Sequence, residues 1–169
     1  MGQSVANKII AEYITSRHLT TPEQCRDAVI QIRTDFDFIA HSVTRSGHAK
    51  QYLYEFTYHA THTNRPAWAG VTHASELPFV FGQPFVNDQF FAHVFPYSWS
   101  PQDKTVSSNM ITLWTNFVKY GNPTPQSVGG VNWPPFSLDS QSYLDIGSSL
   151  SAKVDLAGER VRFWDTILN

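Results

Sequence analysis

The sequence predicts an α/β layered fold with an incomplete sheet. Segments whose apolar residues recur at helical spacing alternate with short strand-like runs, which is typical of helices packed on a sheet. Hydrophobic residues make up 41% of the 169 residues and charged residues 15%, as in a packed globular chain. The recognisable strands are too few for a complete sheet. We therefore expect residues 1–169 to be a segment of one domain, with the rest of the fold elsewhere.

The first part of the chain predicts three helices. Apolar residues recur at helical spacing over 4–14. In Thr21–Gln24, the threonine can cap free backbone N–H groups, the proline suits the first helical position, and the glutamine completes a capping box. A third helix is expected to begin near Thr34–Asp35 and to end before Gly47.

Two strands are predicted further along. Tyr52–Tyr58 is rich in aromatic residues and has Glu55 as its only charge, which indicates a strand buried on both faces, as in a parallel sheet. A short strand is expected at Tyr143–Ile146. The proline- and glycine-rich stretch 122–135 is interpreted as a surface connection inside one domain.

The clearest helix is predicted for Ser100–Tyr120. Ser100 is a suitable N-cap, Pro101 suits the first position, and Gly121 ends the helix. A last helix is expected over Leu156–Leu168. The residues expected to face inward are Val106, Met110, Leu113, Trp114 and Phe117 in the first of these helices, and Val161, Trp164 and Leu168 in the second.

Composition excludes several classes of function. The formal net charge of −2 does not favour binding to nucleic acid or to an anionic membrane surface. The apolar runs are too short for a membrane span. Cys25 is the only cysteine, so no disulfide can form within the chain. His59 and His62 are three residues apart, but no third ligand is apparent nearby, and we expect neither a metal nor a cofactor.

The segment with the most unusual pattern is Trp68–Phe85. His73 follows a predicted strand and lies among the small residues Gly70, Ala74 and Ser75, which leave room for a substrate to approach. Glu76 comes three residues later, before a dense apolar run. A histidine in a loop above a rigid base is a typical arrangement for a catalytic group.

This segment resembles the signature around the catalytic histidine of type-B carboxylesterases and cholinesterases. Gly70–Gly82 is similar to the family pattern G-x-x-H-x-x-E-[LI]-x-[FY]-[VL]-F-G. Other family motifs are matched, in the family's order, at Thr34–Phe38, Tyr52–Phe56, Met110–Pro123, Trp133–Pro134, Tyr143–Ile146 and Phe163–Trp164. The resemblance spans roughly Thr34–Leu168 and implies the C-terminal portion of an α/β-hydrolase fold.

The resemblance implies hydrolysis of carboxylic esters through an acyl-serine intermediate. His73 would be the catalytic histidine, the last triad member in chain order, after the serine and the acid. The pattern G-x-S-x-G of the nucleophile is absent from this sequence, so we expect the serine and the acid upstream and the chain alone to be inactive. In cholinesterases a disulfide joins two positions that match Ala40 and Val161 of this sequence. Neither residue is a cysteine here, so the resemblance favours a general carboxylesterase over a cholinesterase.

The other site residues have alternative interpretations. Glu76 is either a group that positions the histidine loop or a plain surface charge. Trp68, Phe79 and Phe81 are candidates for lining an acyl pocket, with core packing as the alternative. The expected partners are a small-molecule ester and the missing N-terminal part of the same fold, with no nucleic acid and no membrane span.

Two further interpretations of the whole chain stay open. Some relatives in this family have lost the serine and act as adhesion proteins, so a non-catalytic binding module is the main alternative. The chain could also be the product of a split gene or pseudogene that pairs with another chain. The family resemblance suggests secretion or the endoplasmic-reticulum lumen for the intact protein.

Overall fold

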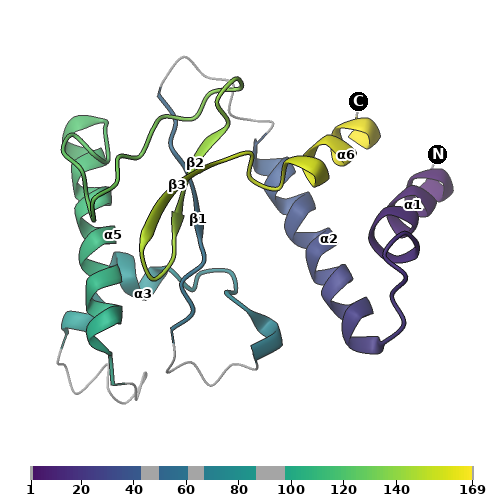
Figure 1. Cartoon of the computed structure of the whole chain (residues 1–169), viewed down its shortest axis with the longest axis horizontal. Coiled ribbons are helices and arrows are strands. Elements are labelled where there is room, and N and C mark those ends of the chain that lie inside the picture. Colours follow the sequence, from purple (N-terminus) through teal and green to yellow (C-terminus); the bar gives the residue numbers. More distant parts are fainter. Residues whose placement is uncertain (1, 43–49, 61–66, 87–97, 169) are drawn as a thin grey trace. The chain divides into compact units, whose positions relative to one another are not determined.

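The computed structural model of the protein describes residues 2–42, 50–60, 67–86 and 98–168, which fall into two compact units (Figure 1). One unit comprises 1–48 and 157–169, and the other comprises 49–156. The first unit contains helices, and the second contains a sheet with helices packed on it. The expected α/β architecture is confirmed, and within the described residues the sheet is a small, open one.

The helical unit consists of α1 (Gly2–Ile10), a π-helical turn η1 (Ala11–Thr15), α2 (Pro22–Ser42) and α6 (Gly158–Leu168). The helix predicted over 4–14 is confirmed, although its last turn is π-helical. Tyr13 in that turn is fully buried. In α6, Trp164 is buried as predicted, whereas Leu168 is 53% exposed, so its predicted inward position is wrong.

The helix α2 combines two helices that the sequence predicted separately. Its start is the expected capping box, in which Gln24 N–H donates to Thr21 Oγ1 at 3.2 Å and Thr21 N–H donates to Gln24 Oε1 at 3.1 Å. The predicted second start at Thr34 is wrong. The Thr34 hydroxyl donates back to the carbonyl of Ile30 at 2.9 Å, which is a bond made inside a helix and not at its start.

The sheet contains β1 (Leu53–Phe56), β2 (Ser142–Ile146) and β3 (Leu150–Val154), in that spatial order. β1 pairs with β2 in parallel and β2 with β3 in antiparallel orientation, so the sheet is mixed. β1 is shorter than the predicted 52–58 and exposes Glu55, so it is not buried on both faces. β3 was not predicted, because only Leu150 among its residues is buried.

The long helix α5 (Pro101–Tyr120) runs alongside the sheet (Figure 1). Its predicted start and end are confirmed, since Ser100 and Asp103 form a reciprocal capping box and Gly121 ends the helix with a φ of 63°. Val106, Met110 and Leu113 face the core as predicted. Phe117 is 46% exposed, although its ring lies edge-on to that of Tyr52 at 5.8 Å.

The loop 122–135 belongs to the core and is more than a surface connection. Trp133 is 6% exposed, its indole N–H donates to the carbonyl of Leu53 at 3.0 Å, and its backbone N–H donates to the Thr124 hydroxyl at 2.9 Å. The core of this unit consists of Tyr58, Ala60, Phe79, Val106, Met110, Leu113, Val128, Trp133, Leu144, Ile146 and Leu150. One face of the sheet, α5 and this loop therefore share a single core.

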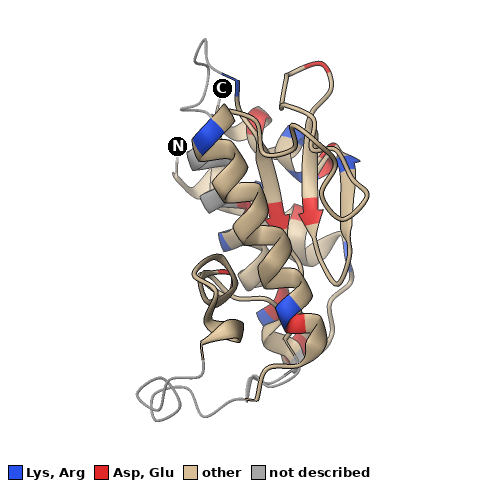
Figure 2. Ribbon diagram, turned by 90° about the vertical axis from the view of Figure 1, so that its left-hand side faces the viewer, with Lys and Arg blue, Asp and Glu red and all other residues tan. Residues whose placement is uncertain are grey.

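Charged residues are spread over the described elements without a concentration of one sign (Figure 2). α5 carries its charges near its two ends, at Asp103, Lys104 and Lys119 (Figure 2). Among the helices of the described residues, none combines the length and the apolar character that crossing a membrane would need.

Candidate active site

His73 lies in a tight turn that is bridged twice across its base. The backbone N–H of Ser75 donates to the carbonyl of Thr72 at 3.1 Å, so His73 and Ala74 occupy the two central positions of a four-residue turn. The hydroxyl oxygens of Thr72 and Ser75 also lie 3.1 Å apart, within hydrogen-bonding distance. The turn is thus closed both by its backbone and by the side chains on either side of it.

The conformation of this turn directs the histidine outward. Ala74 has a φ of 64°, whereas the φ of His73 is negative. A positive φ at the third turn residue alone is the pattern of a type II turn, where glycine is preferred and an alanine is strained. The His73 side chain is exposed, and no hydrogen bond of its imidazole occurs within the part of the chain that the structure describes.

A short helix, α3 (Leu77–Val80), anchors the turn to the core. The Phe79 ring is 2% exposed and lies edge-on to the rings of Tyr58 at 5.4 Å and Trp99 at 5.7 Å. The Ser107 hydroxyl of α5 donates to the carbonyl of Phe79 at 2.7 Å, in a buried position. Because both the ring and the carbonyl of Phe79 are held in the core, α3 forms a rigid base for the turn before it.

The glycine at position 82, two residues after the end of α3, is explained by its backbone conformation and by its neighbour in α5. Gly82 has a φ of 71°, and a Cβ built on it would approach Ile111 Cδ1 of α5 to 3.3 Å. The chain then turns into the short 3₁₀ helix η3 (Gln83–Phe85), while another, η2 (Ala67–Ala69), precedes the histidine turn. A side chain at position 82 would be strained and would crowd the α3–α5 contact.

Glu76 lies immediately before α3 and is half-buried. Burial raises the pKa of the Tyr54 phenol, and the negative charge of Glu76 raises it further. The Glu76 side chain makes no capping bond to α3, and its carboxylate forms neither a hydrogen bond nor an ion pair within the described residues.

The three candidates for pocket lining occupy different environments. Phe79 lies in the core, as in the core-packing alternative. Trp68 is 54% exposed and Phe81 is 77% exposed, so neither ring lies in the core. Leu77 and Phe85 are also exposed, at 45% and 53%.

A buried carboxylate, Asp103, lies in the first turn of α5, in the same unit as the histidine turn. Asp103 is fully buried, accepts a hydrogen bond from the Tyr58 hydroxyl at 2.8 Å, and accepts two more from the N–H and hydroxyl of Ser100. Burial, followed by the contact with Asp103, raises the pKa of Tyr58 to about 12. The capping pattern alone gave no signal for this contact, because Tyr58 is 45 residues away in the sequence.

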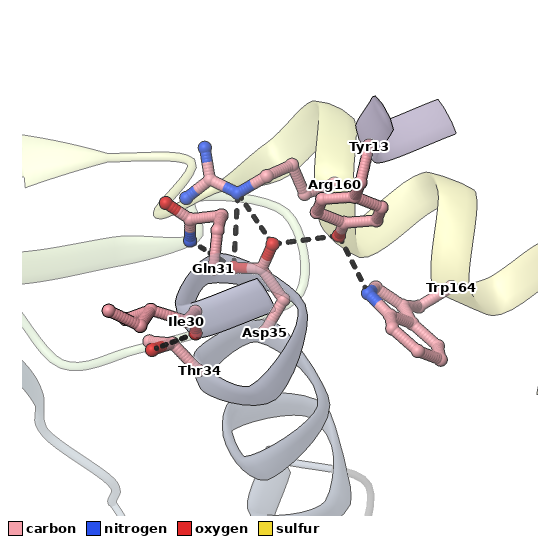
Figure 3. A network of polar contacts seen from close by, with 7 residues as sticks. All are labelled: Tyr13, Ile30, Gln31, Thr34, Asp35, Arg160 and Trp164. Carbon is pink, nitrogen blue, oxygen red and sulfur yellow. Dashed lines mark hydrogen bonds and ion pairs between the residues drawn. The ribbon is translucent and has the colours of Figure 1, made fainter. Parts of the chain in front are cut away.

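A second buried carboxylate, Asp35, occupies the helical unit (Figure 3). It accepts hydrogen bonds from the Tyr13 hydroxyl at 2.7 Å and from the Gln31 amide at 2.9 Å, and it pairs with Arg160 Nε at 2.8 Å. The Tyr13 hydroxyl in turn accepts from the indole N–H of Trp164 at 2.8 Å (Figure 3). Burial and the contact with Asp35 raise the pKa of Tyr13 to about 12. This network ties η1, α2 and α6 together.

Within the described residues, no group of three or more His, Cys, Asp or Glu side chains has the spacing of a metal site. His59 is exposed, and His62 lies outside the described residues.

Comparison with known proteins identifies the family. A family model described as "Carboxylesterase family" matches residues 1–164. The chain is 31% identical over 156 residues to bile salt-activated lipase of Bos taurus, covering 86% of this chain and 25% of the relative. It is 34% identical over 143 residues to bile salt-activated lipase of Homo sapiens, covering 82% of this chain and 18% of the relative. With neuroligin-2 of Homo sapiens it shares 31% identity over 160 residues, covering 84% of this chain and 19% of the relative.

The chain spans a quarter or less of the length of these relatives. Its open mixed sheet with packed helices is consistent with part of an α/β-hydrolase fold. By the family match and by its relatives, the chain belongs to the carboxylesterase family.

Proposed function

We propose that this chain is the C-terminal part of a serine carboxylesterase and supplies its catalytic histidine, His73. The observation that carries the proposal is the exposed imidazole at the corner of a doubly bridged turn, in a chain of the carboxylesterase family. Relatives named as lipases support hydrolysis of esters by the intact protein. The serine and the acid come from sequence beyond these 169 residues, which contain no G-x-S-x-G.

In the proposed mechanism His73 moves one proton in each direction. Its neutral imidazole accepts the proton of the serine hydroxyl as the serine oxygen attacks the ester carbonyl. The resulting imidazolium then donates that proton to the departing alkoxide, which leaves the acyl-serine. Water attacks the acyl-serine in the same way, with His73 as base and then as acid, and this releases the carboxylic acid. An exposed imidazole without a partner in the described chain is free to take both roles.

Glu76 is proposed to position the histidine loop. Its carboxylate is half-buried and has no hydrogen-bond donor within the described residues. Burying a carboxylate without donors is unfavourable, so we expect the rest of the enzyme to supply them. A carboxylate held in that way would fix the start of α3, and with it the turn that carries His73.

Trp68 and Phe81 are proposed to contact the acyl group of the substrate. Both are large and exposed, and both belong to the segment that carries His73. The core position of Phe79 suits it to supporting this segment and not to contacting substrate.

Ester hydrolysis measured on two forms of the protein tests this function. The chain alone should hydrolyse p-nitrophenyl acetate no faster than free imidazole, whereas the chain joined to its upstream sequence should be active. In that longer protein His73→Ala should lower kcat by at least about a thousandfold, as loss of a triad member does. His59→Ala, which removes another exposed histidine of the same unit, should leave kcat unchanged. Full activity of the His73→Ala protein would refute the proposal.

A non-catalytic binding module is the second candidate. Neuroligin-2, whose name states no reaction, matches this chain as closely as the bovine lipase does, at 31% identity in both cases. The upstream sequence separates the two candidates. A G-x-S-x-G motif there supports the esterase, and replacement of its serine supports the binding module.

A further inference from the structure

We infer that Thr72 is a positioning residue for His73 and acts through its hydroxyl bridge to Ser75. This inference rests on the proposed function, because it concerns how the imidazole is aimed at the serine. The bridge joins the residues on either side of the two central turn positions, with 3.1 Å between the hydroxyl oxygens. It lies in a half-buried position, whereas the histidine it supports is exposed.

The bridge reinforces a turn that is strained. Ala74 has a φ of 64°, a conformation that an alanine adopts only when its surroundings hold it there. Leu77 N–H donates to the carbonyl of Ala74 at 3.3 Å, a long bond, so α3 restrains the strained residue only weakly from one side. The Thr72–Ser75 pair restrains it across the turn. The backbone bond of 3.1 Å from the Ser75 N–H to the Thr72 carbonyl closes the same turn beside the bridge.

The direction of the imidazole depends on this turn more than on its own contacts. No hydrogen bond of the His73 ring occurs within the described residues, so this part of the chain orients the ring through the backbone of positions 72–75. A general base must lie about 2.6–3.2 Å from the oxygen or nitrogen that carries the proton, and a shift of about 1 Å can lower the rate a hundredfold. A turn that opens part of the time therefore lowers kcat without changing how substrate binds.

Thr72 is the better of the two positions for a test. Ser75 makes a further contact besides the bridge, so replacing it would disturb more than one interaction. Thr72→Val keeps the shape of the side chain and removes the hydroxyl, while Thr72→Ser keeps the hydroxyl. The chain also offers a matched control, because Ser137 and Ser140 form the same kind of bridge, with 2.9 Å between their hydroxyl oxygens, in a turn before β2.

The first measurement uses the chain as it stands. In Thr72→Val, the Ser75 amide should exchange with deuterium about three to ten times faster, the effect expected for loss of one hydrogen bond. Thr72→Ser should restore slow exchange. Ser137→Ala should leave the Ser75 amide unchanged and accelerate exchange of the Ser140 amide, which donates to the Ser137 hydroxyl at 3.0 Å.

The second measurement uses the chain joined to its upstream sequence, with ester hydrolysis as the readout. Thr72→Val should lower kcat about three- to tenfold at unchanged KM, Thr72→Ser should recover it, and Ser137→Ala should have no effect. If His73→Ala is inactive while Thr72→Val keeps full kcat, the positioning role is overturned and the proposed function stands. If His73→Ala is fully active, the proposed function fails and the positioning role fails with it.

Discussion

Removing the buried carboxylate of Asp103 should strongly destabilise the sheet unit. Asp103→Ala deletes the reciprocal half of the capping box at the start of α5, and loss of a cap costs about 1 kcal/mol. It also leaves the Tyr58 hydroxyl without its acceptor at 2.8 Å in a side chain that is 8% exposed. An unsatisfied buried hydroxyl costs about 1–3 kcal/mol. We therefore expect a loss of about 3 kcal/mol in the free energy of unfolding.

Urea unfolding of the chain, followed by tryptophan fluorescence, measures this loss, since Trp133 is buried in the same core. Tyr58→Phe removes the donor and leaves the cap intact, so it should cost only about 1 kcal/mol. In the double variant the two losses should fall short of their sum by about 1–2 kcal/mol, because the two side chains share one interaction. Asp139→Ala, at an exposed carboxylate of the same unit, serves as the control.

The reasoning fails if Asp103→Ala unfolds within about 0.5 kcal/mol of the unmodified chain, the range typical of surface changes. Strict additivity of the Asp103 and Tyr58 changes would contradict the buried hydrogen bond in particular. In that case the effect of Asp103 would come from the helix cap alone.

Three further predictions concern other contacts. Tyr13 and Tyr58 have a pKa of about 12 in the folded chain, against an ordinary value of 10.0. Their stabilising contribution is therefore complete below pH 10 and is lost as the pH rises through 12. Alkaline unfolding and the absorbance of phenolate should change together in that pH range. Ala74→Gly should raise the free energy of unfolding by up to about 1 kcal/mol in urea titration, because glycine accepts the left-handed conformation. Asp35→Asn should lower the free energy of unfolding, measured by thermal denaturation, by about 2 kcal/mol, since it removes the charge that Arg160 pairs with. Asp27→Asn, which breaks the exposed Arg26–Asp27 ion pair near the start of α2, should have almost no effect.

Elements with their own end signals could be predicted from the sequence. Both ends of α5 follow from local chemistry, because Ser100 and Gly121 act within the adjoining turn. The start of α2 is predictable for the same reason. The separate start at Thr34 was wrong because a threonine followed by an acidic residue is only a permissive signal, and here its hydroxyl bonds within the helix. Local patterns mark where a helix can start, and packing decides whether it does.

Strand β3 shows what local patterns could not predict. Its sequence, Leu150–Val154, has one buried residue, and its place in the sheet depends on antiparallel pairing with β2. An edge strand of this kind needs little apolar character of its own, so its sequence resembles that of a loop. The buried position of Trp133 was missed for a similar reason, since the prolines and glycines around it predict a connection whether or not the loop packs inward.

The segment that carries the candidate site could be located from the sequence, but its geometry could not be predicted. The segment around His73 could be located from its motif, whereas the left-handed Ala74 and the Thr72–Ser75 bridge could not, because alanine gives no signal for positive φ. The contact between Asp103 and Tyr58 needs the fold itself, since β1 and α5 are distant in sequence.

The structure also separates two kinds of residue within the signature of Gly70–Gly82. Phe79 and Gly82 are explained by the fold, one because its ring fills the core and the other because its backbone is left-handed and a Cβ would crowd Ile111 of α5. His73 and Glu76 are different, since within the described residues neither side chain makes a hydrogen bond and folding does not require an imidazole at the exposed corner of the turn. Within the described residues, packing therefore gives a reason for Phe79 and Gly82 in this segment but gives none for His73 or Glu76.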